Sequence, residues 1–135
     1  MNYETARSTL AGAILDALMP YPTLPVFWDN VDNMDLSKAG PLCLLIEFYW
    51  DDAAQLDISQ TPLHRTAGSV YFTIFSHEGT GTKGALQLAD TLTTALKFKN
   101  ITGLVTRVAA PGRRAKRNGW QSQELHLPFY FDSTP

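Results

Sequence analysis

Pro41-Leu-Cys-Leu-Leu-Ile-Glu-Phe-Tyr-Trp50 is the stretch that decides the fold of this chain. Successive side chains of a β-strand point to opposite faces, so alternate residues from Leu42 to Trp50 share one side and those from Cys43 to Tyr49 share the other. Both sides are at least half apolar. The pattern predicts a strand that packs on helices with one face and presents aromatic side chains on the other, which a neighbouring subunit would cover.

Further strands are predicted on both sides of this stretch. Val26–Trp28 is a short extended piece, residues 69–76 are rich in β-branched and aromatic residues, and residues 103–110 form another strand. Residues 123–131 alternate regularly and again place aromatics on both faces at Phe129-Tyr130-Phe131. Because Pro128 cannot donate a ladder hydrogen bond, this strand is expected at a sheet edge or with a bulge. The polar residues 51–64 are predicted to form a loop.

Two amphipathic helices complete the pattern. The first has its buried face at the spacing of one helix side and ends at Met19-Pro20; that face is Leu10, Ala13, Ile14, Ala17 and Leu18. The second follows Gly79-Thr80-Gly81-Thr82, where either threonine is placed to cap it. Its apolar stripe is Ala85, Leu88, Ala89, Leu92, Ala95 and Leu96.

These elements predict the fold class. We expect an α+β domain with a mostly antiparallel sheet of four to five strands, two helices on one face and the order α-β-β-β-α-β-β. With 135 residues, of which 44% are hydrophobic, the chain suits a single domain spanning residues 1–135.

Composition narrows the cellular setting. The net charge of −2 gives no strong overall field for nucleic acid, and charged residues make up only 18% of the chain, so we expect a partner to cover part of the surface. Cys43 has no second cysteine with which to pair, which favours a reducing compartment. The start has no signal-peptide layout and no apolar run is long enough for a membrane span, so we expect a soluble intracellular product without membrane contact.

A phosphate-binding loop is the first chemical candidate. Residues 79–84, Gly-Thr-Gly-Thr-Lys-Gly, lie between a strand and a helix, where such a loop would be. The Walker pattern needs a lysine after the last glycine, but Lys83 precedes it and Ala85 follows it. We interpret the segment as a strand-to-helix turn.

Metal, acid–base and nucleophilic sites have little support. His64, His77 and His126 lie on separate elements without paired ligand spacing. Asp51-Asp52 falls in a polar stretch, where solvated turn residues are the ordinary interpretation. Neither a nucleophile motif nor a base near Cys43 is present, so we expect no enzymatic activity, no metal and no cofactor.

The charges are segregated along the chain. Seven of the thirteen acids fall between residues 29 and 57, namely Asp29, Asp32, Asp35, Glu47, Asp51, Asp52 and Asp57. Five of the eleven bases fall between residues 107 and 117, namely Arg107, Arg113, Arg114, Lys116 and Arg117. The run from Arg113 to Arg117 lies in a predicted loop, residues 110–119. This basic run suits either nucleic acid or an acidic surface of a partner or sister subunit, against the alternative of a solvated hairpin tip.

The order of these elements, with several short motifs, resembles the tail-terminator-like proteins of long-tailed bacteriophages and prophages. The resemblance covers nearly the whole chain. It is carried by the N-terminal helix, Leu24–Asn30, Pro41–Trp50, Arg65–Gly68 before the strand 70–75, Gly79-Thr80-Gly81 before the second helix, Trp120, and Leu127–Phe131.

The resemblance implies a structural role. Members of this family are α+β domains that form a ring, typically a hexamer, at the head-proximal end of the tail tube. The ring ends tube polymerisation and presents the surface to which the head attaches, without catalysis or cofactor. Implied partners are sister subunits, the tail tube protein, the head–tail connector protein and DNA passing through the ring, and the implied location is the virion tail, with assembly in the host cytoplasm. A phage neck or head-completion protein, a small nucleic-acid-binding module and a small hydrolase or ligand-binding domain remain alternatives.

Overall fold

The computed structural model describes residues 1–29, 41–58, 60, 62–77, 79, 82–117 and 119–133, with the backbone alone at position 117. Asp32 and Asp35 of the acidic stretch and the possible cap Thr80 lie outside these residues. The elements are α1 (Tyr3–Ala17), β1 (Val26–Trp28), β2 (Leu42–Gln55), β3 (His64–His77), α2 (Lys83–Leu96), β4 (Asn100–Ile101), β5 (Leu104–Thr106), β6 (Ala110–Arg117) and β7 (Trp120–Ser133).

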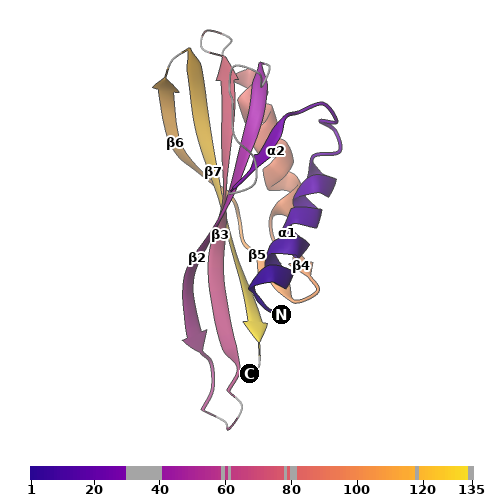
Figure 1. The fold of residues 1–135 in the computed structure, drawn as a ribbon, viewed down its shortest axis with the longest axis vertical. Coiled ribbons are helices and arrows are strands. Elements are labelled where there is room, and N and C mark those ends of the chain that lie inside the picture. Colours follow the sequence, from indigo (N-terminus) through magenta and orange to yellow (C-terminus); the bar gives the residue numbers. More distant parts are fainter. Residues whose placement is uncertain are drawn as a thin grey trace.

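One open sheet holds all seven described strands. Its order is β1-β2-β3-β7-β5-β4, and β6 pairs with β7 next to β5. All pairings are antiparallel except that of β1 with β2. Both helices lie on one side of the sheet (Figure 1). The predicted α+β class, element order and placement of the helices are confirmed, although the sheet has seven strands rather than four to five.

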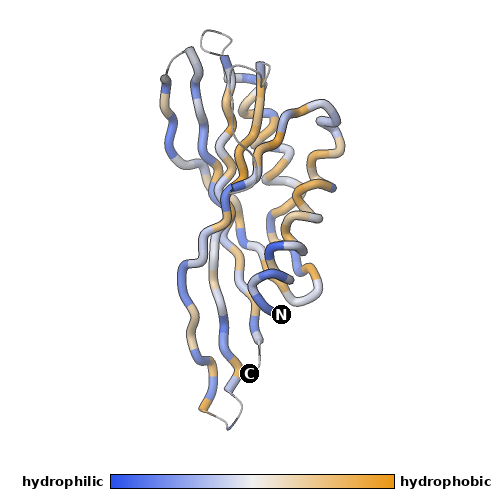
Figure 2. Tube along the Cα trace, viewed as in Figure 1, coloured by the Kyte–Doolittle hydropathy of each residue, from blue (hydrophilic) through white to orange (hydrophobic). Residues whose placement is uncertain are grey.

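The core lies between the helices and one face of the sheet. Leu10 and Ile14 of α1 and Leu88 and Leu92 of α2 are fully buried there, as the predicted stripes require. The sheet side of the core is Leu44, Ile46, Val70, Phe72, Ile74, Leu125, Leu127, Phe129 and Phe131. Figure 2 shows the hydrophobic residues concentrated along the helices and the strands beside them, whereas β6 is mostly hydrophilic.

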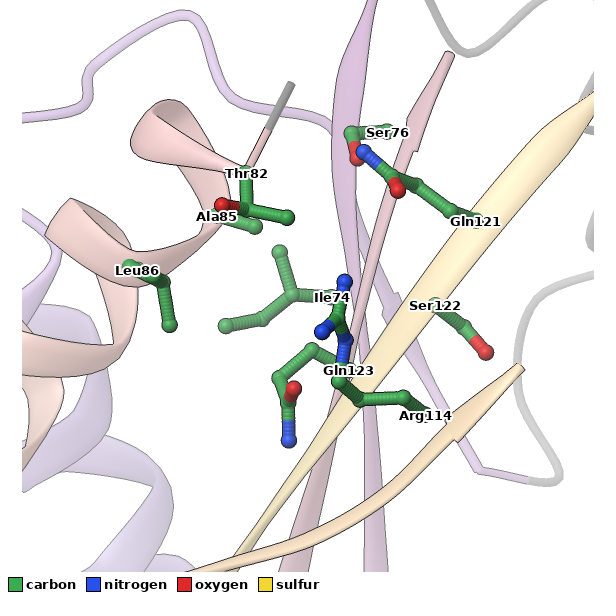
Figure 3. Close-up of a pocket in the computed structure, with 9 residues that line it drawn as sticks. All are labelled: Ile74, Ser76, Thr82, Ala85, Leu86, Arg114, Gln121, Ser122 and Gln123. Carbon is green, nitrogen blue, oxygen red and sulfur yellow. The ribbon is translucent and has the colours of Figure 1, made fainter. Parts of the chain in front are cut away.

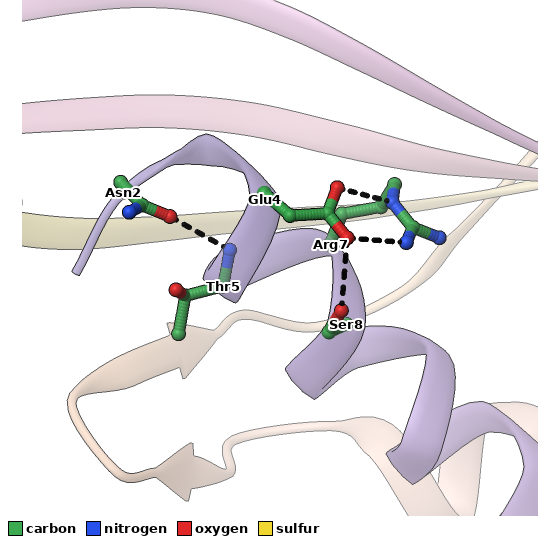
Figure 4. A network of polar contacts seen from close by, with 5 residues as sticks. All are labelled: Asn2, Glu4, Thr5, Arg7 and Ser8. Atoms are coloured by element: carbon green, nitrogen blue, oxygen red, sulfur yellow. Dashed lines mark hydrogen bonds and ion pairs between the residues drawn. The ribbon is translucent and has the colours of Figure 1, made fainter.

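Helix α1 begins before its apolar stripe because Asn2 caps it. The Asn2 Oδ1 accepts a hydrogen bond of 2.8 Å from the Thr5 N–H (Figure 4). Glu4 pairs with Arg7 at 2.7 Å, and the Ser8 hydroxyl donates to the same carboxylate. The hydrogen bond from Arg7 lowers the pKa of Glu4. Neither of the two described helices is long and apolar enough to cross a membrane.

The expectation of a loop from residue 51 to residue 64 is wrong at its two ends, residues 51–55 and residue 64. β2 continues to Gln55 and β3 begins at His64, with Gln55 paired to His64 in register. A register shift between Trp50 and Asp52 interrupts the ladder. Because residues 51–55 are exposed on both faces, their extended conformation rests on backbone hydrogen bonds and leaves no apolar periodicity to detect.

Pro128 lies in an inner strand, contrary to the expectation of an edge or a bulge in β7. β3 pairs with β7 along one side, and β5 and β6 pair with it along the other. The partner on that second side changes between His126, which faces Ala110, and Phe129, which faces Thr106. Pro128 sits at this change, so a missing N–H costs the ladder little.

Thr106 ties the end of α2 to β5, and its hydroxyl is expected to matter for stability. Thr106 is 1% exposed, its Oγ1 accepts a bond of 2.8 Å from the Lys99 N–H, and its hydroxyl donates to the Leu96 carbonyl. Thr106→Val keeps the shape but leaves both backbone groups unpaired, so we expect a loss of about 2 kcal/mol in the free energy of unfolding. Urea denaturation measures it, and Thr106→Ser, which keeps the hydroxyl, should retain more than half of the lost stability. Equal losses in the two variants would contradict this role.

Candidate functional site

The basic run forms the edge strand β6, not the predicted loop. β6 pairs with β7 from Ala110 opposite His126 to Arg117 opposite Trp120, with a register shift between Pro111 and Arg114. Its described side chains are exposed from Ala110 to Lys116. A strand that is polar on both faces has no hydrophobic period, so the sequence pattern favoured a loop. Pairing with β7 supplies the hydrogen bonds that hold it extended.

The cationic residues of β6 differ in their surroundings along the strand. Arg114 and Lys116 lie opposite Gln123 and Gln121, on the helix side of the sheet. The Arg113 N–H donates to Glu124 Oε2 at 3.4 Å. The backbone of Arg117 continues the strand to the turn. The sequence therefore located a true cluster of cations, but placed it on the wrong kind of element.

Arg107 does not belong to this cluster. Its guanidinium lies over the Tyr130 ring, 5.1 Å from the centroid, and the Arg65 guanidinium lies 4.1 Å from the same ring. Arg65 also pairs with Asp132 at 2.8 Å. That hydrogen bond lowers the pKa of Asp132. Arg107 is thus part of a separate cation–aromatic group, which joins β3, β7 and the connection after β5.

The described aspartates of the acidic stretch 29–57 lie at the opposite edge of the sheet. Asp29 follows β1, and its carboxylate accepts a bond of 3.0 Å from the Phe48 N–H. Asp51 and Asp52 lie in β2, and Asp57 follows that strand. Because β1 and β2 are the first strands of the sheet and β6 lies beyond β7, the charges that are separated in sequence are also separated in space.

The sheet face away from the helices carries aromatic and apolar side chains. None of the described helices lies against it (Figure 1). The strand registers place Leu45, Tyr49, Tyr71, Phe75, His126 and Tyr130 there. Tyr49 is 47% exposed and meets the edge of Tyr71 at 5.0 Å between ring centroids. This outer face is the one for which the sequence predicted aromatics on the second side of the strands.

A serine and a histidine meet on the outer face. Ser69 is 3% exposed, and its Oγ lies 2.8 Å from His126 Nε2. The same hydroxyl donates to Asp51 Oδ2 at 3.1 Å. A serine nucleophile needs its proton directed to the histidine and the carboxylate on the other ring nitrogen. Here the serine hydroxyl donates its hydrogen to the Asp51 carboxylate. The Asp51, Ser69 and His126 side chains therefore link β2, β3 and β7 rather than activating the serine oxygen.

The other predicted chemical candidates are dispersed. His64 Nε2 lies 2.8 Å from the Ser133 hydroxyl, and His77 stacks on Trp120 at 4.3 Å between centroids. Within the described ranges, no group of three or more histidine, cysteine, aspartate or glutamate side chains is arranged to hold a metal ion. Cys43 is fully buried, and this burial raises the pKa of its thiol to about 11, which leaves little nucleophilic thiolate near neutral pH.

Comparison with known proteins supports the fold alone. No family model matches the chain, and no curated protein matches it significantly. One solved protein aligns with a TM-score of 0.73 and 18% identity over 100% of this chain and 99% of its own. A chain from a structure titled "Virion of native gene transfer agent (GTA) particle" aligns with a TM-score of 0.55 and 16% identity, over 95% of this chain and 92% of its own. The architecture therefore recurs in at least two distant solved proteins.

Proposed function

We propose that this chain is a structural virion protein that forms a ring at the head-proximal end of a phage tail tube. The ring would end tube polymerisation and provide the surface to which the head attaches. Its partners would be sister subunits, the tail tube protein and the head–tail connector protein, with DNA passing through the channel.

The observation that carries this proposal is the opposite charge of the two sheet edges. A cyclic assembly joins two different surfaces of the same subunit head to tail. The edge with β6 offers Arg113, Arg114 and Lys116, and the edge with β1 and β2 offers Asp51 and Asp52. Such complementary charges guide and orient a head-to-tail contact between copies of one chain.

Two further observations support the proposal. The aromatic outer face has no helix over it in the described part of the chain, which suits a protein whose surface is completed by neighbours. The fold is also similar, over nearly the full length of both chains, to a component of a gene transfer agent virion. A shared fold does not fix a shared role, so the function rests on the test that follows.

The proposal predicts a ring in solution. At low salt we expect a particle of about six times the mass of one chain by light scattering after size exclusion, and closed rings in negative-stain images. Salt should shift the distribution to smaller species, since the attraction between exposed charges decays over a screening length of about 8–10 Å at physiological ionic strength and over a shorter length as salt rises. A monomer at every salt and protein concentration would refute self-assembly. Rings that bind purified capsids but not tail tubes would identify a neck or head-completion protein instead.

A further inference from the structure

A small pocket lies between the start of α2 and the β6–β7 hairpin. Its volume is about 200 Å³. Ile74, Ala85 and Leu86 give it an apolar side, and its polar lining is Ser76, Thr82, Arg114, Gln121, Ser122 and Gln123. Figure 3 shows the Arg114 side chain extending from β6 across β7 toward Ile74 and the first turn of α2. The lining contains a cation and no carboxylate.

Ser76 is the first sign that this pocket takes a ligand. The residue is 5% exposed, and its hydroxyl oxygen is buried without a hydrogen-bond partner among the described residues. A buried hydroxyl without a partner destabilises the folded state, and native proteins rarely retain one. Because Ser76 lines the pocket, a ligand there is placed to bond with it.

The N-terminus of α2 is the second sign. Thr82 is the N-cap residue, but its side chain makes no capping hydrogen bond, and the first turn contains no acidic residue. The first N–H groups of a helix have no partner within the helix and carry the positive end of its dipole. Thr82 and Ala85 line the pocket, so the first turn of α2, which carries these N–H groups, forms part of its wall. The sequence suggested a threonine cap here, and the absence of that side-chain bond leaves the donors for another acceptor.

Arg114 supplies a positive charge to the pocket. Its position opposite Gln123 directs it to the helix side of the sheet, and no described carboxylate pairs with it. Glu124 lies on the opposite face, where it accepts from the Arg113 N–H. A guanidinium, a buried hydroxyl and helix N–H groups are all donors, and together they form a site for an anion.

We propose that this pocket binds the carboxylate of a glutamate or aspartate side chain presented by a partner protein. The apolar lining suits the methylene groups that precede such a carboxylate, and one guanidinium matches one negative charge. A nucleic-acid strand would instead need a line of cations along successive phosphates, which a small pocket with one arginine does not provide. The inference deepens the proposed function, in which β6 meets an acidic surface. Its test uses the isolated chain, so failure of either proposal leaves the other standing.

Titration with propionate, a carboxylate with a short apolar tail, tests the site. At constant ionic strength, we expect saturable chemical-shift changes of the Lys83, Gly84 and Ala85 amides, with a millimolar dissociation constant. Arg114→Gln should weaken binding about tenfold or more, because it removes the charge-assisted bonds. Arg113→Gln is the matched control, since this neighbour removes the same charge without lining the pocket, and it should leave the affinity within about twofold.

Ser76→Ala separates a ligand-binding role from a structural one. If the hydroxyl serves the ligand, its removal should weaken propionate binding several-fold while the melting temperature stays the same or rises. A lower melting temperature with unchanged binding would assign Ser76 to the fold and overturn its place in the site. Absence of saturable shifts, or equal shifts in the Arg114→Gln variant, would overturn the pocket as an anion site. Inorganic phosphate that competes at equal or lower concentration would replace the carboxylate with a phosphate ligand.

Discussion

Gly68→Ala is expected to lower the free energy of unfolding by about 3 kcal/mol. A Cβ at this position of β3 would lie 2.6 Å from the Tyr49 carbonyl oxygen and 2.7 Å from the Phe129 ring. The backbone of β2 cannot move away without breaking the pairing of Gly68 with Trp50, and Phe129 is held edge-on by Trp50 at 5.7 Å between centroids. The glycine therefore makes room for the aromatic ring that crosses it.

Urea denaturation of Gly68→Ala, with Gly12→Ala beside it, measures this effect. Gly12→Ala is the control, because a Cβ at Gly12 in α1 meets nothing within 4 Å. Alanine favours a helix over glycine, so Gly12→Ala should raise the free energy of unfolding by about 0.5–1 kcal/mol. Similar stabilities for the Gly68 variant and the wild type would show that β2 and Phe129 rearrange without cost.

The parts of the fold with a hydrophobic period were predictable from the sequence. Both helices, the strand 69–76 and the strand from Leu42 carry apolar residues at the spacing of a buried face, and each lies where that spacing indicated. Burial of apolar side chains both creates the sequence pattern and stabilises the element, so the pattern predicts the structure.

The polar strands were not predictable in this way. Residues 51–55 of β2 and the cationic β6 are exposed, and pairing with a neighbouring strand holds them extended. Backbone hydrogen bonds leave no trace in the identity of the side chains. For the same reason, no pattern of side chains indicated that β7 pairs with two successive strands around Pro128.

The candidate site shows the same division. The cluster of cations at residues 113–117 was visible as a run of like charge, whereas the position of Arg107 over Tyr130 depends on the sheet register. The pocket at Ser76 draws its lining from β3, α2, β6 and β7. No local sequence motif predicts a pocket whose lining comes from four separate elements. The only partial indication in the sequence was the Gly-Thr-Gly-Thr stretch at residues 79–82, before α2.

Removing the cations of β6 is expected to weaken self-assembly about 100-fold without unfolding the protein. In the triple variant Arg113→Ser, Arg114→Ser and Lys116→Ser, each lost exposed ion pair across the contact contributes up to about 1 kcal/mol, and three such losses give this change. All three residues are exposed, and the ion pairs among the described residues, Arg7 with Glu4 and Arg65 with Asp132, involve none of them. The melting temperature should therefore stay nearly unchanged.

The matched control is the triple variant Lys83→Ser, Lys97→Ser and Lys99→Ser. It removes the same positive charge from exposed positions on and after α2. Sedimentation velocity across a series of salt concentrations compares the two. If the position of the charge matters, the control should assemble as the wild type does, and the β6 variant should remain dissociated with little dependence on salt, since its attractive pairs are already gone. Equal weakening in both variants would show that assembly responds only to net charge, and unchanged assembly of the β6 variant would remove this edge from the contact.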